Sequence, residues 1–556
     1  MFGSVLKRRW PFWRALAGIV VLLALPGCGP ADVNFADCVG QVAGGARQME
    51  ACTQVIEEAA GRADRRSTAY LRRGVGWSAK GDNDSALADF DKAISIDPKR
   101  ADAYTNRGLI WFAKGDSNHA MADYDQAMNL DPRYAGAYYN RALVWSQKGD
   151  RDRAMTDYTK AIEVDPKYMP AYINRGVILV DKGEYDRAIV DYDQAITLDP
   201  KLAISYSNRG LAWARKGDND RAIADYDKAA GPDPKFGTVY YNRGKAWFAK
   251  SDYDRAIADF SQAITLDPTK AVLYGNRGLA WYRKNDNARA IADYDKAIGL
   301  DPKNIDTYNN RGLVWADRSD YDRAIADFDQ TISLNPKYAK AYRNRAMAWS
   351  GKGDYDRVIA DLDQAIGLDP KDAGAYRDRG LAWIDKGGDI NHAIADFSTA
   401  ILLDPQNAYG YSGRGILNFY SGALAKAQAD LEQAAMLKPD DAYLAIMLSL
   451  ADRRNAAVDH LREATGKLDM TKWPAPVVRM LLGEKTSAET LAAADDPDPA
   501  TKTGRVCEAN FYTAELSRIQ GHDDEALRLY RLAVSDCPKN FDEYRAARLA
   551  LRALSP

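Results

Sequence analysis

Residues 104–132 read YTNRGLIWFAKGDSNHAMADYDQAMNLDP. Tyr104, Gly108 and Trp111 follow the i, i+4, i+7 spacing that places side chains on one face of an α-helix. The same spacing returns in the second half of the stretch, at Ala120, Tyr124 and Ala127. The stretch therefore predicts two helices. Their small residues would allow a close approach, and their aromatic rings would fill the remaining space.

Short polar segments mark the ends of these two helices. Gly115 suits the left-handed conformation that follows a helix, and Asp116 suits the position that caps the next one. Asp131 and Pro132 end the second helix, because proline cannot continue a helix and restricts the residue before it. We call the first helix of such a unit helix A and the second helix B.

The unit recurs along the chain with a fixed period. Its first Tyr returns every 34 residues, with one step of 35 after the added residue at Gly387-Gly388, at Tyr70, Tyr104, Tyr138, Tyr172, Tyr206, Tyr240, Tyr274, Tyr308, Tyr342, Tyr376 and Tyr411. Its proline follows in step, at Pro98, Pro132, Pro166, Pro200, Pro234, Pro268, Pro302, Pro336, Pro370, Pro405 and Pro439. One helix pair cannot bury its own apolar face, so eleven stacked repeats are expected.

This order of aromatic, Gly, aromatic, Ala, aromatic, Ala and Pro residues resembles the tetratricopeptide repeat, abbreviated TPR. The resemblance implies an all-α fold, a right-handed superhelical solenoid with irregular helical caps and a concave face lined mainly by A helices. Some repeats depart from the pattern. Gly231-Pro232 predicts a shortened helix B in repeat five, and Ser251 and Ser319 replace the turn glycine at a cost of about 1 kcal/mol each.

The N-terminal residues are typical of an export signal. A cationic start at residues 7–9 precedes an apolar run at residues 15–25, which is shorter than the roughly 20 residues that span a bilayer. The following Leu-Pro-Gly-Cys28 resembles a bacterial lipobox, in which Cys28 is lipidated, although Pro26 stands where a small residue is usual. The sequence predicts a lipoprotein, with ordinary cleavage nearby as the alternative. Gly29 favours the outer over the inner membrane by analogy.

Four further cysteines fit an exported protein. Cys38 and Cys52 lie near the N-terminus, and Cys507 and Cys537 near the C-terminus. An oxidising compartment predicts two disulfides, Cys38–Cys52 and Cys507–Cys537. The second pair would join the same end of two antiparallel helices.

The repeats define five regions of the chain. Residues 1–27 are expected to be the signal peptide and residues 28–66 an N-terminal helical cap with a degenerate half-repeat. The eleven repeats occupy residues 67–442, an irregular helical region residues 443–504, and a last TPR-like repeat with a capping helix residues 505–556.

The C-terminal region carries a second resemblance. Asp469-Met-Thr-Lys-Trp473-Pro, Leu482-Gly-Glu484, Cys507-Glu-Ala-Asn-Phe511-Tyr and Asn540-Phe-Asp-Glu-Tyr544 are similar to the tail of NlpI-type periplasmic TPR lipoproteins. This resemblance covers about residues 469–552. It implies an adaptor that brings envelope proteins together, and it does not identify a partner.

The sequence offers no catalytic, metal or cofactor motif. The four histidines, His119, His392, His460 and His522, are far apart in the sequence, and none has metal-ligand spacing with another. Ser412, within Gly-Tyr-Ser-Gly, is expected inside a helix and not at a nucleophile elbow. The 76 basic and 78 acidic residues nearly balance, so nucleic acid is not an expected partner.

One polar ladder predicts a binding surface. An asparagine follows the repeat Tyr by two residues in eight consecutive repeats, at Asn106, Asn140, Asn174, Asn208, Asn242, Asn276, Asn310 and Asn344. In the TPR superhelix of O-GlcNAc transferase, which this pattern resembles, such a ladder lines the groove and binds peptide backbone. A carboxamide both donates and accepts hydrogen bonds, as a peptide group does. The alternative is a structural asparagine that is solvated or bonded to a neighbouring helix.

A second ladder is charged. An arginine follows the repeat Tyr by three residues in all eleven repeats, at Arg73, Arg107, Arg141, Arg175, Arg209, Arg243, Arg277, Arg311, Arg345, Arg379 and Arg414. Helix B carries a matching aspartate, at Asp89, Asp123, Asp157, Asp191, Asp225, Asp259, Asp293, Asp327, Asp361, Asp396 and Asp430. The matched counts predict ion pairs within the array, which fix register more than they add stability. Recognition of an acidic ligand is the alternative.

These observations predict a non-catalytic scaffold of the bacterial cell envelope, tethered by lipid and facing the periplasm. It would bind proteins or extended peptide segments of the envelope in its groove, and a homo-oligomer is left open. One alternative is an assembly or pilot lipoprotein of a secretion, pilus or polysaccharide-export machine. The other is a hydrolase within residues 443–556.

Overall fold

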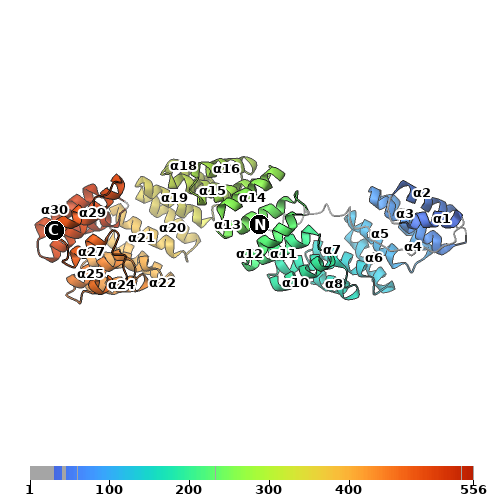
Figure 1. The fold of residues 1–556 in the computed structure, drawn as a ribbon, viewed down its shortest axis with the longest axis horizontal. Coiled ribbons are helices and arrows are strands. Elements are labelled where there is room, and N and C mark those ends of the chain that lie inside the picture. The colour runs from blue at the N-terminus through green and yellow to red at the C-terminus, as the bar shows by residue number, and fades with distance from the viewer. Residues whose placement is uncertain are drawn as a thin grey trace. The chain divides into compact units, whose positions relative to one another are not determined.

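A computed structural model describes residues 30–40, 45–58, 61–231, 233–387, 389–539 and 541–554. The expected signal peptide and Cys28 lie outside these ranges. All regular secondary structure in the described ranges is helical, in 31 helices, many of which Figure 1 labels. The predicted all-α class is therefore confirmed. No helix among the described residues is both long and apolar enough to cross a bilayer.

Contacts divide the chain into two units, Met1–Pro268 and Thr269–Pro556. The first unit contains α1(Pro30–Val39), α2(Ala46–Glu58), α3(Ala63–Lys80), α4(Asn83–Ile96), α5(Ala101–Ala113), α6(Ser117–Leu130), α7(Ala135–Gln147), α8(Arg151–Val164), α9(Met169–Asp181), α10(Tyr185–Leu198), α11(Ala203–Lys216), α12(Asn219–Ala230), α13(Gly237–Ala249) and α14(Tyr253–Leu266).

The second unit begins with five helix pairs and ends with seven further helices. Its helices are α15(Ala271–Arg283), α16(Asn287–Leu300), α17(Ile305–Asp317), α18(Tyr321–Leu334), α19(Ala339–Lys352), α20(Tyr355–Leu368), α21(Ala373–Gly387), α22(Ile390–Leu403), α23(Ala408–Tyr420), α24(Leu424–Leu437), α25(Ala442–Arg454), α26(Leu461–Ala464), α27(Ala475–Leu481), α28(Ser487–Ala492), α29(Pro499–Ile519), α30(Asp523–Asp536) and α31(Asp542–Leu554).

The pair α5 and α6 shows why the repeat residues form this unit. A Cβ atom added to Gly108 would lie 2.7 Å from Cε1 of Tyr124, so only glycine lets the two helices approach this closely. The Tyr124 ring is fully buried, together with Ala120 and Ala127. The small residues and the ring therefore pack as the spacing predicted.

The turn between α5 and α6 and the C-terminal end of α6 also agree with the sequence-based prediction. Gly115 takes the left-handed conformation at φ 86°, which costs glycine little. The Asp116 carboxylate accepts hydrogen bonds from the backbone amides of Asn118 and His119, and so caps α6. α6 ends at Leu130, directly before Asp131 and Pro132.

The softer repeats behave as expected. In repeat five, α12 has 12 residues, whereas α10 and α14 have 14 each. Ser251 and Ser319 adopt φ values of 61° and 58° in the left-handed region. Asn285 does the same at φ 61°. Asn285 is thus a third strained turn, in addition to the two serines that were predicted.

Stacking continues from pair to pair within each unit. Each helix A packs against its own helix B, and each helix B packs against the next helix A. Successive A helices also touch, for example α5 with α7 and α11 with α13 in the first unit, and α15 with α17 in the second. We use the term A-helix row for the surface side chains of these successive A helices, which include the eight ladder asparagines.

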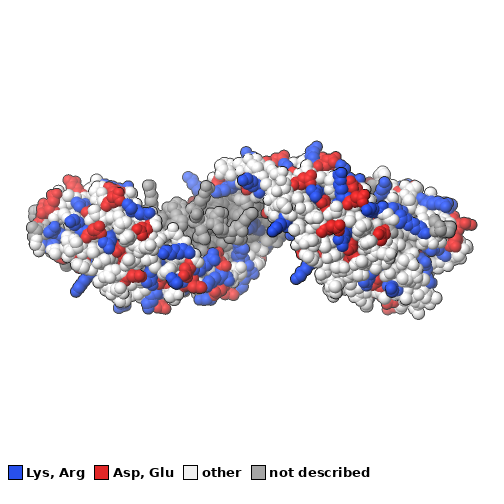
Figure 2. All heavy atoms as spheres, turned by 180° about the vertical axis from the view of Figure 1, so that it is seen from behind, with Lys and Arg blue, Asp and Glu red and all other residues white. Residues whose placement is uncertain are grey.

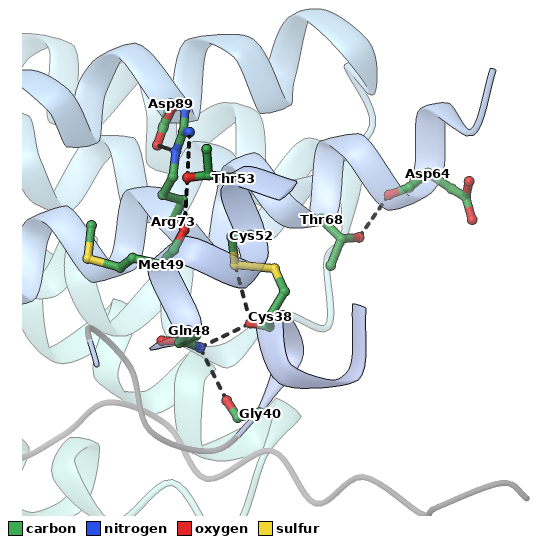
Figure 3. The surroundings of a disulfide bond; sticks show 10 residues. All are labelled: Cys38, Gly40, Gln48, Met49, Cys52, Thr53, Asp64, Thr68, Arg73 and Asp89. Atoms are coloured by element: carbon green, nitrogen blue, oxygen red, sulfur yellow. Dashed lines mark hydrogen bonds and ion pairs between the residues drawn. A yellow bond between two sulfur atoms is a disulfide. The ribbon is translucent and has the colours of Figure 1, made fainter. Parts of the chain in front are cut away.

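The N-terminal cap is closed by a disulfide. α1 and α2 are joined by Cys38 and Cys52, whose Cα atoms lie 4.6 Å apart, and both side chains are fully buried. Figure 3 shows Gln48 beside this bond. The Gln48 side chain donates to the carbonyls of Cys38 and Gly40, at 3.1 and 3.2 Å. The end of α1 is therefore held against α2 by both a covalent bond and hydrogen bonds.

The C-terminal helices form the largest apolar core of the described chain, with side chains from α21 to α31. A second disulfide joins Cys507 on α29 to Cys537 at the end of α30, with a Cα separation of 5.0 Å. The last helix, α31, packs on α30 and also touches α23, the helix A of repeat eleven. The chain thus folds back onto its own A helices.

α31 also contacts α21, the helix A of the repeat that carries the extra residue. α21 has 15 residues, and its Asp385 side chain accepts two hydrogen bonds from Arg545, at 2.9 and 3.1 Å. Arg548 and Arg552 donate to the backbone carbonyls of Asp385 and Gly387. Cations at the C-terminus of a helix are stabilising, because the unpaired carbonyls there carry partial negative charge.

Candidate protein-binding surface

The A-helix row places the eight ladder asparagines at equivalent positions, five in the first unit and three in the second. Asn140 is 8% exposed, and the other seven are partly exposed. Side chains at this position therefore lie at the surface of helix A without standing fully in solvent. Their hydrogen bonds divide them into two groups.

Four of the asparagines are engaged within the chain. Two donate to the carbonyl of the preceding helical turn: Asn106 to Asp102 and Asn276 to Val272, both at 2.8 Å. The other two reach the preceding helix A, where Asn174 donates to the Tyr139 hydroxyl at 3.1 Å and Asn344 donates to the Asn309 carboxamide at 2.8 Å. At these last two positions the structural alternative holds.

The other carboxamides have no such partner. In the described part of the chain no hydrogen bond is formed by the side chains of Asn140, Asn208, Asn242 and Asn310. The neighbour of Asn208 on the preceding helix A is Ile173, which cannot bond it. The row of asparagines without a hydrogen-bond partner is thus discontinuous. Asn208 and Asn242 are two such asparagines in consecutive repeats. Its role in ligand binding stays a prediction.

The charged ladder forms the predicted ion pairs in all eleven repeats. In repeat two, Nε and Nη2 of Arg107 donate to the two carboxylate oxygens of Asp123, at 2.9 and 2.6 Å. Asp123 is 5% exposed. Such a two-point fork is the strongest common carboxylate contact. These arginines are therefore not free to bind a ligand.

The third nitrogen of the guanidinium adds a contact that sequence reasoning missed. Nη1 of Arg107 donates to Asp91 on the helix B of the preceding repeat, at 2.7 Å. Aspartates at the same position serve Arg141, Arg209, Arg243, Arg311, Arg345 and Arg379. One arginine thus joins its own repeat to the one before. The 16-residue spacing of Asp91 and Arg107 was the available signal.

Models of known repeat families match much of the array. Models described as "TPR repeat" match residues 79–115, 108–149, 176–217 and 278–317. Models described as "Tetratricopeptide repeat" match residues 135–168, 238–270, 310–373 and 157–190. The chain is a tetratricopeptide-repeat protein. This TPR protein has the architecture of a protein-binding scaffold.

Solved structures include similar proteins. MamA is 29% identical, with 31% of this chain and 94% of MamA covered at a TM-score of 0.29. YrrB, described as a TPR protein with an unusual peptide-binding site, is 24% identical, with 33% and 95% covered and a TM-score of 0.30. Yeast Tom70 is 18% identical, with 77% and 97% covered and a TM-score of 0.38. The family assignment rests on the repeat models.

Two histidines of this TPR protein have structural partners. His119 stacks on Trp111 with ring centroids 5.0 Å apart, and its Nδ1 lies 2.6 Å from the Asp116 carboxylate. His392 repeats this arrangement on Trp383, at 4.9 Å. In six other repeats an arginine lies over the equivalent tryptophan of its own repeat, at Arg153, Arg221, Arg255, Arg289, Arg323 and Arg357. Among the described residues no His, Cys, Asp and Glu group could hold a metal ion.

Charged side chains of both signs are dispersed over the face in Figure 2. Another kind of ion pair links successive repeats: a Lys near the end of helix A meets an Asp of the preceding helix B. Lys114 and Asp84, 2.6 Å apart, are one such pair. The Asp84 side chain is 86% exposed, so this pair contributes little to stability.

Three carboxylates in the C-terminal region bear on the hydrolase alternative. Glu508, Glu515 and Glu543 are at most 8% exposed. They accept hydrogen bonds from Tyr443, Trp473, Tyr420, Tyr530 and Tyr512. Burial raises the pKa of all three, and for Glu543 burial and the nearby Glu508 charge raise it to about 7. Through these hydrogen bonds the three carboxylates join helices of the C-terminal core.

Proposed function

We propose that this TPR protein is a lipid-anchored adaptor of the bacterial cell envelope, which binds extended segments of other envelope proteins along its A-helix row. The observation that carries the proposal is the pair of free carboxamides on consecutive A helices, Asn208 and Asn242. A peptide backbone lying along them could donate to and accept from each one. The ladder arginines of repeats five and six are already paired with aspartates, whereas these two amides remain available for backbone contact.

The lipid anchor and the envelope location rest on the N-terminal sequence. Residues 7–28 combine a cationic start, a short apolar run and Cys28. The paired cysteines support an oxidising compartment. The resemblance of residues 469–552 to NlpI-type lipoproteins supports an adaptor role. The proposed adaptor has no catalytic activity of its own.

The test compares two asparagine variants. Changing both Asn208 and Asn242 to Ala should weaken binding, because each net hydrogen bond contributes about 0.5–1.5 kcal/mol. Folding should survive, because alanine is the better helix former. Changing Asn174 to Ala should instead act on stability, because that side chain bonds Tyr139.

The readout is photo-crosslinking in cells. A photoreactive residue at Leu211 on the A-helix row should capture partners, and the same residue at Val190, which is 57% exposed on helix B, should not. Capture from Leu211 should fall when Asn208 and Asn242 are alanine. Equal capture from both positions, or capture insensitive to the asparagines, would remove the A-helix row as the binding surface.

A further inference from the structure

Two cations on the A-helix row form no ion pair with any described residue. Arg215 lies on α11 and Lys245 on α13, and both are exposed. In the described part of the chain neither takes part in an ion pair, although the ladder arginines of the same helices are all paired. α11 and α13 are in contact as successive A helices.

Lys245 departs from the pattern of its neighbours. The equivalent positions in repeats two to five are Leu109, Leu143, Val177 and Leu211. An aliphatic side chain is thus the rule there, and a lysine is not needed for stacking. Lys245 is held over the Tyr241 ring, with its Nζ 5.7 Å from the ring centroid.

The two cations share the surface with the free carboxamides. Asn242 precedes Lys245 by three residues, and Asn208 precedes Arg215 by seven, so each pair lies on one face of its helix. Burial and the positive charge of Arg215 lower the pKa of Lys245. The two like charges therefore interact unfavourably, and an anion between them would relieve that cost.

We propose that Arg215 and Lys245 bind the side-chain carboxylate of an Asp or Glu in an extended peptide segment, whose backbone lies along Asn208 and Asn242. The inference rests on the proposed peptide-binding function and adds the chemistry of the ligand. An arginine offers a planar fork for the carboxylate and a lysine a point charge. Charge-assisted hydrogen bonds are about twice as strong as neutral ones. Recognition would therefore favour acidic segments.

The test uses the full chain and two short fluorescent peptides, blocked at both ends, that differ only in a central Glu or Gln. Fluorescence polarisation should show the Glu peptide binding about tenfold tighter at low salt. Raising the salt should reduce this preference. NMR titration of Lys245 should show its pKa rising when the Glu peptide is bound, and not when the Gln peptide is bound.

Matched variants separate the site from general charge effects. Lys245→Leu restores the residue of neighbouring repeats, so it should fold normally and lose the preference for Glu, as should Arg215→Gln. The affinity for the Gln peptide should not change in either. Lys235→Gln removes an exposed lysine near the start of α13 and should leave both affinities unchanged.

Each other outcome has a distinct meaning. Equal binding of both peptides by the unmodified chain would overturn this inference and leave the proposed function standing. Binding of neither peptide would overturn both. A third peptide, with Gln in the centre and a free C-terminal carboxylate, tests the source of the anion. If it bound tighter than the Glu peptide, the assignment to an acidic side chain would be wrong.

Discussion

The ladder aspartates hold negative charge where almost no water reaches. Asp191 and Asp225, for example, are 3% and 4% exposed. Removing an ion from water costs several kcal/mol, and the attraction of a well-placed partner offsets this cost. Each aspartate therefore depends on its arginine. The pair specifies how helix A meets helix B more than it adds to stability.

Breaking one such pair should be costly, and removing both partners should not. Arg209→Leu leaves Asp225 buried without its partner, so we expect a loss of about 3–5 kcal/mol. Arg209→Leu combined with Asp225→Leu should recover most of it. Hydrogen exchange of α11 and α12 is the measurement, because a repeat array need not unfold in two states. Lys216→Gln, which removes the exposed pair with Asp186, is the control and should cost about 0–1 kcal/mol. Unchanged exchange in Arg209→Leu would contradict the prediction.

Exchanging serine and glycine at turn positions with positive φ should change the stability of a repeat in opposite directions. Ser251 lies at φ 61°, which is strained for a residue with a Cβ atom, so Ser251→Gly should stabilise its repeat by about 1 kcal/mol. The reverse change, Gly149→Ser at φ 82°, should destabilise by a similar amount. Hydrogen exchange of the two flanking helices reports each effect. A destabilising Ser251→Gly would show that the serine side chain has another role.

At the scale of the elements, α31 should respond to pH through Glu543. Its pKa of about 7 lies above the ordinary value of 4.5, so between these values the folded protein holds a proton that the unfolded chain has lost. The free energy of unfolding should therefore fall as the pH rises through this window. The raised pKa of Glu508 acts in the same direction.

The measurement is hydrogen exchange of α31, corrected for the intrinsic effect of pH. Protection of α31 should be weaker at about pH 8 than at about pH 5. Glu543→Gln keeps the hydrogen-bond acceptor for Tyr512 without the charge, and should flatten the dependence. The helix pair α11 and α12, which contains neither a glutamate nor a histidine, serves as the internal reference. Protection that increases with pH would refute the assignment.

The periodic elements were predictable from sequence because each rests on local spacing. The A and B helices follow from Tyr, Gly and Ala at helical intervals, and the Asp–Pro steps mark their ends. The return of α31 was not predictable in this way, because the contact of Arg545 with Asp385 joins residues 160 positions apart. The sequence showed the extra residue of repeat ten, but it did not predict that α21 would have 15 residues.

The candidate site was predicted only in part, for the same reason. The ladder position of the asparagines was readable, and so were the arginine–aspartate pairs. For Asn174 and Asn208, the difference lies in the residue 35 positions earlier, on the preceding helix A. Tyr139 accepts from Asn174, whereas Ile173 cannot bond Asn208. A repeat consensus does not contain that comparison.

For the whole molecule, the first expectation concerns Cys28. Two or more acyl chains bind a membrane stably, whereas one binds only marginally. Cys28→Ser should therefore move the protein from the membrane to the soluble fraction after cell lysis, without changing its fold. A Cys28→Ser chain that stays with the membrane fraction would show that lipid on this residue is not the tether.

The disulfides close the first and the last helix pairs of the described chain. Terminal repeats have one stacking neighbour, so an array ordinarily frays from its ends. Here a pull on the N-terminal side passes from Cys38 directly to Cys52, and the residues between them carry none of the load. Under tension the chain should yield first in its interior, at a stacking interface such as the one beside the shortened α12. The noncovalent contact between two neighbouring repeats, and not the attachment of either end, then sets the force that the molecule withstands.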